Sequence, residues 1–327
     1  MAAYLLRRIL WMIPTLWVVS IVSFLIIQLP PGDFASAMAA QYEASGEKVN
    51  QVALDSLRTR YGLDEPVIVQ YVKWMEGVLR GDFGYSFIYN RPISQLIWER
   101  LGLTVVISIL TLLLTWILAF PVGIYSAVHR YTPWDYIFSF LGFVGLSIPA
   151  FMLALISMWI SFRYFHITLG GLFSSEFIDA PWNVARLRDL LQHLWVPLVI
   201  LGTSGTAGMI RILRANLSDE LHKPYVIAAR SRGLPEIYLL LKYPLRAAVN
   251  PFVGTIGWSL PEMISGETIV AIVLSLPTCG PLLLQALMAQ DMYLAGAFIL
   301  LLSTLTVIGT LISDLLLAWL DPRIQLE

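Results

Sequence analysis

Two carboxylates, Glu262 and Glu267, lie within an otherwise apolar stretch at residues 249–276. An ionisable side chain inside a membrane helix costs about 2.5–3.5 kcal/mol on insertion scales, so it normally faces protein or water rather than lipid. The spacing of five residues places the two carboxylates about 140° apart on a regular helix, although Pro261 and Gly266 interrupt that regularity. We expect either a polar lining of a path across a membrane or structural hydrogen bonds to a neighbouring helix or to a partner subunit.

Few other residues could support catalysis or bind a metal. The sequence contains no phosphate-binding G-x-x-x-x-G-K-[ST] loop, and its apolar stretches contain no H-E-x-x-H, Ser-His or paired-aspartate constellation. The single cysteine, Cys279, excludes a disulfide framework and a cysteine-rich metal site. The histidines are scattered near the ends of apolar stretches, at His129, His166, His193 and His222. We therefore assign no catalytic residue, no metal and no cofactor to this chain.

The composition indicates an integral membrane protein. Hydrophobic residues make up 57% of the 327 residues and charged residues only 13%, with a mean hydropathy of +0.73. Average proteins carry roughly 25% charged residues, so this chain has too few charges to cover a water-facing surface. Its net charge of −1 offers no electrostatic case for nucleic-acid binding or for a polybasic surface anchor.

The hydropathy pattern predicts six membrane spans. A helix that crosses a bilayer needs about 20 mostly apolar residues. The stretches that qualify are residues 9–32, 101–128, 136–162, 194–210, 249–276 and 292–313. Arg7 and Arg8 precede the first stretch, but it is longer than the roughly 7–15 apolar residues of a signal peptide. We predict an all-α integral membrane protein with six transmembrane helices, the first of which is not cleaved.

Basic residues in short loops indicate which side of the membrane is cytoplasmic. Segment 211–246 contains seven Lys or Arg residues against three acidic residues, and Arg7, Arg8 and Arg130 lie on the same side. Segment 163–193 on the opposite side holds three arginines and runs against this bias. The distribution favours a cytoplasmic location for both termini.

The spans divide the chain into three parts. These are residues 1–32 with the cytoplasmic N-terminus and first helix, an extracytoplasmic segment at 33–100, and a five-helix core at 101–327. Within the extracytoplasmic segment, helix-like stretches at 52–60 and 66–79 precede a turn at 81–84. We expect this segment either to pack as a cap on the membrane surface or to serve as a docking platform for a soluble partner.

The cytoplasmic loop 211–247 contains a helix–break–helix pattern. Residues 225–232 are compatible with a helix, Gly233 suits a left-handed C-terminal cap, and Pro235-Glu236 starts a second helix. The pair Ala228-Ala229 leaves little side-chain bulk on the first helix. A short helix with small residues and basic flanks can lie in a groove of another protein. The alternative is an ordinary surface loop.

The pair Ala228-Ala229, followed after three residues by Gly233, resembles the EAA loop of bacterial ABC-importer permeases. Other motifs resemble the B-type permease subunit of the dipeptide/oligopeptide transport family, in the same order along nearly the whole chain. They are Tyr4-Leu-Leu-Arg-Arg-Ile9, Pro31-Gly-Asp33, Arg60-Tyr-Gly-Leu-Asp-Glu-Pro66, Gly81-Asp-Phe-Gly84, Ser147-Ile-Pro-Ala-Phe151, residues 228–234 and Asp321-Pro-Arg-Ile324. Each motif alone is weak, whereas seven in the right order are specific.

The resemblance implies a type I ABC-importer permease fold in the bacterial cytoplasmic (inner) membrane. It assigns an ATPase-coupling loop to Tyr225, Ala228, Ala229, Arg232 and Gly233. Our candidates for the translocation path are Ser147, Pro149, Glu262, Glu267 and Thr268, of which Glu267-Thr268 occupies the family's Glu-Thr position. The implied partners are a second homologous permease subunit, two ATP-binding subunits that hydrolyse ATP, an extracytoplasmic substrate-binding protein and membrane lipid.

The sequence departs from the family pattern at three places. Ile227 replaces the glutamate of the EAA signature, and Leu245-Arg246 replaces its Leu-Pro ending. Leu276-Pro-Thr-Cys-Gly280 stands where the subgroup has Trp-Pro-Gly-Leu-Gly, near the expected external gate. Peptides are the family's default substrate, but similar permeases serve oligosaccharides, opines and nickel, and the last departure is compatible with such a change.

Two other functions remain as alternatives. A secondary transporter or ion-translocating subunit would use Glu262 and Glu267 as proton sites, although the sequence shows no inverted repeat of the kind that many such carriers have. An intramembrane enzyme would need a catalytic constellation within the spans, and the sequence contains none.

Overall fold

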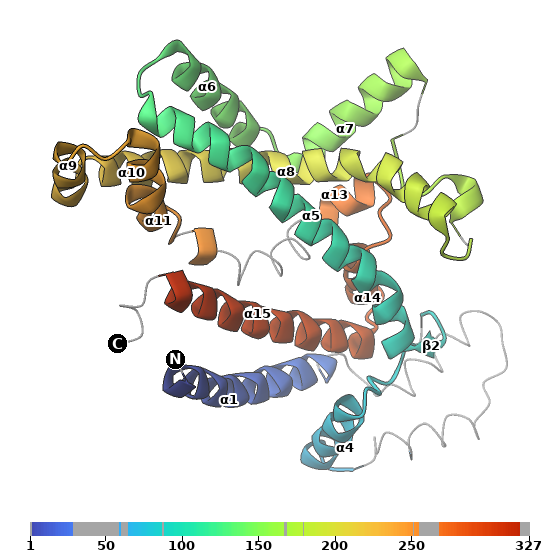
Figure 1. The fold of residues 1–327 in the computed structure, drawn as a ribbon. Coiled ribbons are helices and arrows are strands. Elements are labelled where there is room, and N and C mark those ends of the chain that lie inside the picture. The colour runs from blue at the N-terminus through green and yellow to red at the C-terminus, as the bar shows by residue number, and fades with distance from the viewer. Residues whose placement is uncertain are drawn as a thin grey trace. The chain divides into compact units, whose positions relative to one another are not determined.

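The structure is a computed structural model of the chain (Figure 1). It describes residues 2–28, 59, 65–86, 88–166, 169–178, 180–250, 252–254 and 268–320. Glu262, Glu267 and Asp321 lie outside the described residues, as do most of stretch 52–60 and the middle of stretch 249–276. The chain divides into two compact units, which are described separately below. The first consists of residues 1–5, 103–278 and 308–327, and the second of residues 6–102 and 279–307.

The first unit is built from helices. They are α6 (Pro133–Ser147), α7 (Ala150–Ile160), α8 (Val184–Leu221), α9 (Pro224–Ser231), α10 (Glu236–Lys242), α11 (Pro244–Ala248) and α13 (Thr268–Val273). A π-helical turn, η1 (Ser161–Phe165), directly follows α7, and a 3-10 turn, η2 (Ser175–Phe177), precedes α8. Helix α5 (Ile93–Val128) contributes from residue 103 onward and α15 (Met292–Leu320) from residue 308 onward.

The second unit contains α1 (Ala2–Ile27) from residue 6, α4 (Val67–Leu79), α14 (Cys279–Met288) and the first parts of α5 and α15. Its two strands, β1 (Tyr85–Ser86) and β2 (Arg91–Pro92), form one short antiparallel ladder in which Tyr85 pairs with Pro92. This ladder was not predicted from the sequence. Because it is so short, it leaves the all-α character of the chain unchanged.

Four helices in the described part of the chain are long and apolar enough to cross a membrane. These are α1, α5, α8 and α15, and they coincide with the predicted spans that start at residues 9, 101, 194 and 292. The predicted all-α membrane fold is therefore confirmed. Only the two ends of stretch 249–276 are described, since residues 255–267 are not among the described residues.

The third predicted span, residues 136–162, is not one continuous helix. Helix α6 ends at Ser147, α7 begins at Ala150, and the two are bent by 97°. Ile148 adopts extended backbone angles (φ −92°, ψ 118°), because a residue that precedes proline avoids the helical region and Pro149 has no N–H to donate. Pro149 therefore divides the predicted span into two helices.

Helix α8 is longer than the apolar stretch 194–210 from which this span was predicted. It comprises 38 residues and begins at an N-cap, Asn183, whose side chain accepts a hydrogen bond of 2.8 Å from the Arg186 N–H. Hydropathy delimits only the part of a helix that suits lipid, whereas backbone hydrogen bonds continue wherever the sequence tolerates a helix. As a result, α8 extends through charged sequence to Leu221 and leads directly to α9.

Apolar packing and close helix contact hold the first unit together. One buried cluster joins α7, α8 and α13 and includes Ala154, Ile200 and Val270. Where α5 meets α8, a Cβ atom on Gly123 would lie only 2.9 Å from the Leu213 Cδ2 atom. The absence of a side chain at this glycine therefore lets the two helices approach closely, as small residues commonly do in membrane proteins.

In the second unit, α4 packs against α1 through aromatic rings. The ring of Phe24 lies 5.5 Å from that of Tyr71 and 5.7 Å from that of Trp74, and the Ser20 and Tyr71 hydroxyls are 2.7 Å apart. Trp74 is buried in this contact, whereas Val67 at the start of α4 is exposed.

The predicted turn at residues 81–84 is confirmed. Gly81 and Gly84 have positive φ angles of 81° and 94°, and Asp82 accepts a hydrogen bond of 3.0 Å from the Gly84 N–H. Asp291, which is fully buried, accepts a 2.6 Å hydrogen bond from the Ser86 hydroxyl and another from the Leu294 N–H. This carboxylate joins the strands to the start of α15.

Candidate functional site

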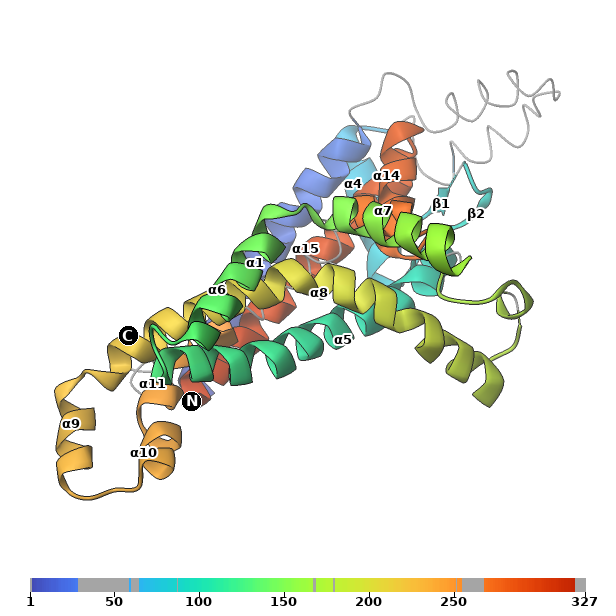
Figure 2. The ribbon, with the colours of Figure 1, turned by 90° about the horizontal axis from the view of Figure 1, so that it is seen from above.

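Helices α9 and α10 form a short hairpin, residues 224–242, that follows the end of α8 (Figure 2). Pro224 occupies the first position of α9, where its missing N–H costs nothing. The helix ends at Ser231 with Arg232 as its C-cap, and Gly233 then has a φ of 76°, a left-handed conformation that glycine adopts without a steric penalty. Pro235 precedes α10. The predicted helix–break–helix pattern is thus confirmed.

The two alanines of α9 lie in different environments. Val226 and Ala229 are buried against Leu239 of α10, and this small apolar cluster holds the two helices together. Ala228 is exposed. Because consecutive residues of an α-helix point about 100° apart, Ala229 faces α10 and stabilises the hairpin while Ala228 belongs to its outer surface.

The outer surface of α9 is available for contact with another molecule. Ile227 is 53% exposed and Tyr225 is 41% exposed, and Arg232 is also exposed. The position where the EAA signature has glutamate is therefore an exposed, apolar side chain. Together with Ala228, these residues form a surface that is small, partly apolar and basic, which we call the α9 outer face (Tyr225, Ile227, Ala228 and Arg232).

Ion pairs fix the turn of the hairpin and the junction between α8 and α9. The Arg230 guanidinium donates hydrogen bonds of 2.6 and 3.1 Å to the two carboxylate oxygens of Glu236, across the Gly233 turn. The hydrogen bond and charge of Arg230 hold the pKa of the Glu236 carboxyl below its usual range. At the start of the hairpin, Lys223 and the Tyr225 hydroxyl both donate to Glu220. Burial and the hydrogen bond to Glu220 raise the pKa of Tyr225, so this hydroxyl remains protonated.

A buried ion pair attaches α6 to α8 near the end of α8 that leads to the hairpin. The Asp135 carboxylate, 1% exposed, accepts two hydrogen bonds of 2.7 Å from the Arg214 guanidinium. The same carboxylate accepts a 2.9 Å hydrogen bond from the N–H of Tyr131, which has a positive φ of 62°. Asp135 therefore orders the turn between α5 and α6 as well as fixing α6 on α8.

Sequence reasoning missed this pair as a structural element. One signal was present, because Thr132, Pro133 and Asp135 form a helix-start pattern, and the Thr132 side chain indeed caps α6. The other half, Arg214, lies 79 residues away. No local pattern connects the two positions.

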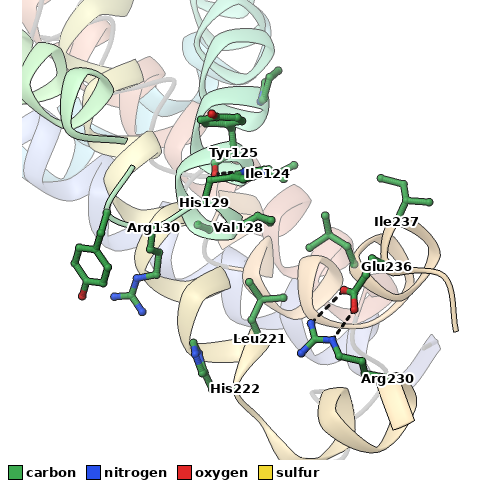
Figure 3. Close-up of a pocket in the computed structure, with 14 residues that line it drawn as sticks. Ile124, Tyr125, Val128, His129, Arg130, Leu221, His222, Arg230, Glu236 and Ile237 are labelled. Atoms are coloured by element: carbon green, nitrogen blue, oxygen red, sulfur yellow. Dashed lines mark hydrogen bonds and ion pairs between the residues drawn. The ribbon is translucent and has the colours of Figure 1, made fainter. Parts of the chain in front are cut away.

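A cavity of about 880 Å³ lies beside the hairpin (Figure 3). It is lined by the C-terminal part of α5, the following turn at 129–131, the end of α8, and Arg230, Glu236 and Leu240 of the hairpin. In Figure 3, His129 and Arg130 lie on one side of this space, and the Arg230–Glu236 pair lies on the other.

The candidates for the translocation path are only partly described. Ser147 and Pro149 meet at the break between α6 and α7, where the Ser147 hydroxyl donates a 2.7 Å hydrogen bond to the Phe143 carbonyl. Thr268 begins α13 and is partly buried. Glu262 and Glu267 lie outside the described residues. Their role stays a prediction.

The sequence matches two protein-family models. Residues 119–326 match the family described as binding-protein-dependent transport system inner membrane component. Residues 1–108 match the N-terminal membrane component of the same kind of transport system. The first match covers more than half of the chain. The chain belongs to this family. The family predicted from the sequence motifs is therefore confirmed, and the protein is a multi-pass inner-membrane permease of the ABC class rather than an enzyme.

The permease is similar to curated proteins over its whole length. It is 34% identical to the oligopeptide transport system permease protein AppB of Bacillus subtilis, with 99% of this chain and 100% of that protein aligned. It is 30% identical to the dipeptide transport system permease protein DppB of Alkalihalophilus pseudofirmus, with 99% and 100% aligned. It is 31% identical to the glutathione transport system permease protein GsiC of Salmonella paratyphi A, with 99% of each chain aligned.

Proposed function

We propose that this permease forms half of the translocation path of an ATP-driven importer and that the α9–α10 hairpin couples it to a separate ATP-binding subunit. The observation that carries the coupling role is the construction of the hairpin. Its interior is fixed by Val226, Ala229 and Leu239, while the α9 outer face remains exposed. A rigid helix with an exposed, small-residue surface suits insertion into a groove of a partner protein.

The proposed assembly contains this permease, a second homologous permease, two ATP-binding subunits and an extracytoplasmic substrate-binding protein. The family description, a component of a binding-protein-dependent transport system, supports this composition. With both termini in the cytoplasm, as the basic residues favour, the hairpin lies on the side where ATP is available. ATP hydrolysis would then occur in the partners, and we expect no cofactor in this chain.

The proposed substrates are peptides or peptide-like solutes. Three relatives that align over their full or nearly full length are named for oligopeptide, dipeptide and glutathione transport, which supports this substrate class. We propose that the break at Ser147 and Pro149, together with Glu262, Glu267 and Thr268, contributes to the path. A proton-coupled carrier remains the competing function, and it would transport after ATP depletion but stop with an uncoupler.

The coupling role is tested by reversing a charge on the α9 outer face. Arg232→Glu in the complete complex, reconstituted in liposomes, should lower substrate-stimulated ATP hydrolysis about tenfold, the effect of roughly 1.4 kcal/mol of lost docking energy. The matched control is Arg163→Glu, an exposed arginine of η1 that lies outside the hairpin. Equal ATP hydrolysis in the two variants would refute the coupling role.

A further inference from the structure

The cavity beside the hairpin combines an apolar lining with a basic edge. Ile124, Val128, Leu221, Ile237 and Leu240 supply apolar side chains from three helices. Its volume of about 880 Å³ lies within the range of roughly 300–1,000 Å³ that is typical of small-molecule sites. Such a lining suits hydrocarbon, and the charged groups around it decide which kind of molecule carries that hydrocarbon.

The edge of the cavity carries a net positive charge. Arg230 and Glu236 face the cavity as an ion pair and cancel each other. Arg130 is exposed, and its guanidinium lies 5.5 Å from the centre of the Tyr131 ring. This arginine therefore supplies the net charge of the edge.

Two histidines, His129 and His222, also line the edge of the cavity. Nδ1 of His129 lies 3.3 Å from the Tyr125 carbonyl and Nδ1 of His222 lies 2.7 Å from the Ser218 carbonyl. A carbonyl oxygen can only accept, so Nδ1 carries the proton in each ring. The other nitrogen, Nε2, is then the atom through which each ring can contact a ligand.

The cavity lies where lipid tails give way to water. The apolar stretch of α5 ends at Val128, and His129 and Arg130 follow immediately. Tyr131 and Trp134 next to them are 69% and 58% exposed. Exposed aromatic rings beside basic residues are typical of the boundary between membrane and water. Lipid headgroups occupy this depth on either side of a membrane, so the location does not depend on the coupling role of the hairpin.

We propose that this cavity binds one anionic phospholipid, whose acyl chain lies against Val128, Leu221 and Leu240 and whose phosphate meets Arg130. Basic pockets between helices at the membrane surface bind acidic headgroups by charge attraction. A zwitterionic lipid offers the same chains without net charge, so it gains less from Arg130. The bound lipid would fill the space between α5 and the hairpin and thereby hold the hairpin against the membrane-embedded part of the first unit.

The test is native mass spectrometry of the complete, detergent-purified permease complex, titrated with phosphatidylglycerol or with phosphatidylcholine of identical acyl chains. The wild type should retain phosphatidylglycerol more tightly. Arg130→Gln should weaken that binding about fivefold, the effect of one basic residue near an anionic headgroup. Arg163→Gln, which removes an exposed arginine outside the cavity, should leave the affinity unchanged.

A second pair of variants tests the apolar part of the site. Val128→Trp fills the cavity from a position that is 45% exposed, so folding should be preserved, and the tightly bound phosphatidylglycerol should be lost. Val106→Trp on the same helix, from a position that is 43% exposed and outside the cavity, is the matched control.

Four results would overturn the proposal. They are equal affinity for the two lipids, equal effects of Arg130→Gln and Arg163→Gln, undiminished binding by Val128→Trp, and equally tight binding of glycerol 3-phosphate, which has no acyl chain. Retention of the lipid by the permease alone but not by the complete complex would also overturn it, because the cavity would then belong to a protein interface.

Discussion

The guanidinium of Arg214 donates two hydrogen bonds of 2.7 Å to the carboxylate of Asp135. The aspartate is 1% exposed and the arginine side chain 27% exposed. Their geometry satisfies both oxygens of the carboxylate, and the Tyr131 N–H adds a third donor. This pair links the first turn of α6 to the part of α8 that leads to the hairpin, so its integrity bears directly on the position of the proposed coupling element.

Removing one member of this pair should destabilise the first unit. Asp135→Asn should lower the free energy of unfolding by about 3 kcal/mol, because breaking a buried ion pair leaves an uncompensated charge. Denaturant titration of the full-length permease in detergent measures the loss. As a control, Arg211→Gln changes an exposed arginine of α8, the helix that carries Arg214. It should shift the free energy of unfolding by no more than about 0.5 kcal/mol. If Asp135→Asn and Arg214→Gln add fully in the double variant, the two residues are not coupled.

A side chain at Gly123 should separate α5 from α8. In Gly123→Ala the new Cβ atom would meet the Leu213 side chain at 2.9 Å, and overpacking of about 1–3 kcal/mol outweighs the gain in helix propensity of about 1 kcal/mol. We expect a net loss of about 1 kcal/mol in the free energy of unfolding, measured in the same detergent.

Gly102→Ala on the same helix provides the control, since no atom lies within 4 Å of its added Cβ. This variant should be neutral or up to about 1 kcal/mol more stable. A gain of stability in both variants would show that a methyl group fits between α5 and α8 at Gly123 without steric overlap.

The turn of the hairpin should tolerate asparagine but not valine at position 233. Gly233 has a φ of 76° with open space around it, so the cost of a side chain is backbone strain alone. A left-handed conformation costs an L-residue about 1–2 kcal/mol, and asparagine adopts it far more readily than a β-branched residue. Hydrogen exchange of the amides in residues 224–242 should accelerate in Gly233→Val and change little in Gly233→Asn. Equal exchange in both variants would contradict the left-handed turn.

The ion pair across the hairpin turn should break in acid and loosen the turn. Because Arg230 lowers the pKa of the Glu236 carboxyl below its ordinary value of 4.5, the ion pair is fully formed above that value and is lost as the pH falls through the lowered pKa. Spin labels on Ser231→Cys and Tyr238→Cys, in a Cys279→Ala background, should give a narrow distance distribution at pH 7 that widens below about pH 4.5. Glu236→Gln should give a wide distribution at every pH, and a narrow one would show that the ion pair does not close the hairpin.

Local properties of the sequence determined several features correctly. The positions of α1, α5, α8 and α15 follow from hydropathy, because the cost of placing a residue in lipid is a property of that residue. Gly233 and Pro235 marked the turn of the hairpin, because backbone preferences act between sequence neighbours. The same preferences interrupt the third span before Pro149, where we predicted one continuous span. The sequence could not show that this interruption is a 97° break, since the angle between two helices depends on what each of them packs against.

Only the tertiary structure decided which residues meet across the chain. It buried Ala229 against Leu239 and left its neighbour Ala228 exposed. The sequence Ala228-Ala229 alone does not distinguish these two environments. It also joined Asp135 to Arg214 over 79 residues. Such pairings depend on the path of the chain in space, and a charge or a small side chain acquires its role only when a partner is placed within a few ångströms of it. The sequence by itself therefore determined the spans at α1, α5, α8 and α15 and the turn of the hairpin, and the packing of α5, α6 and α8 determined how the hairpin is held.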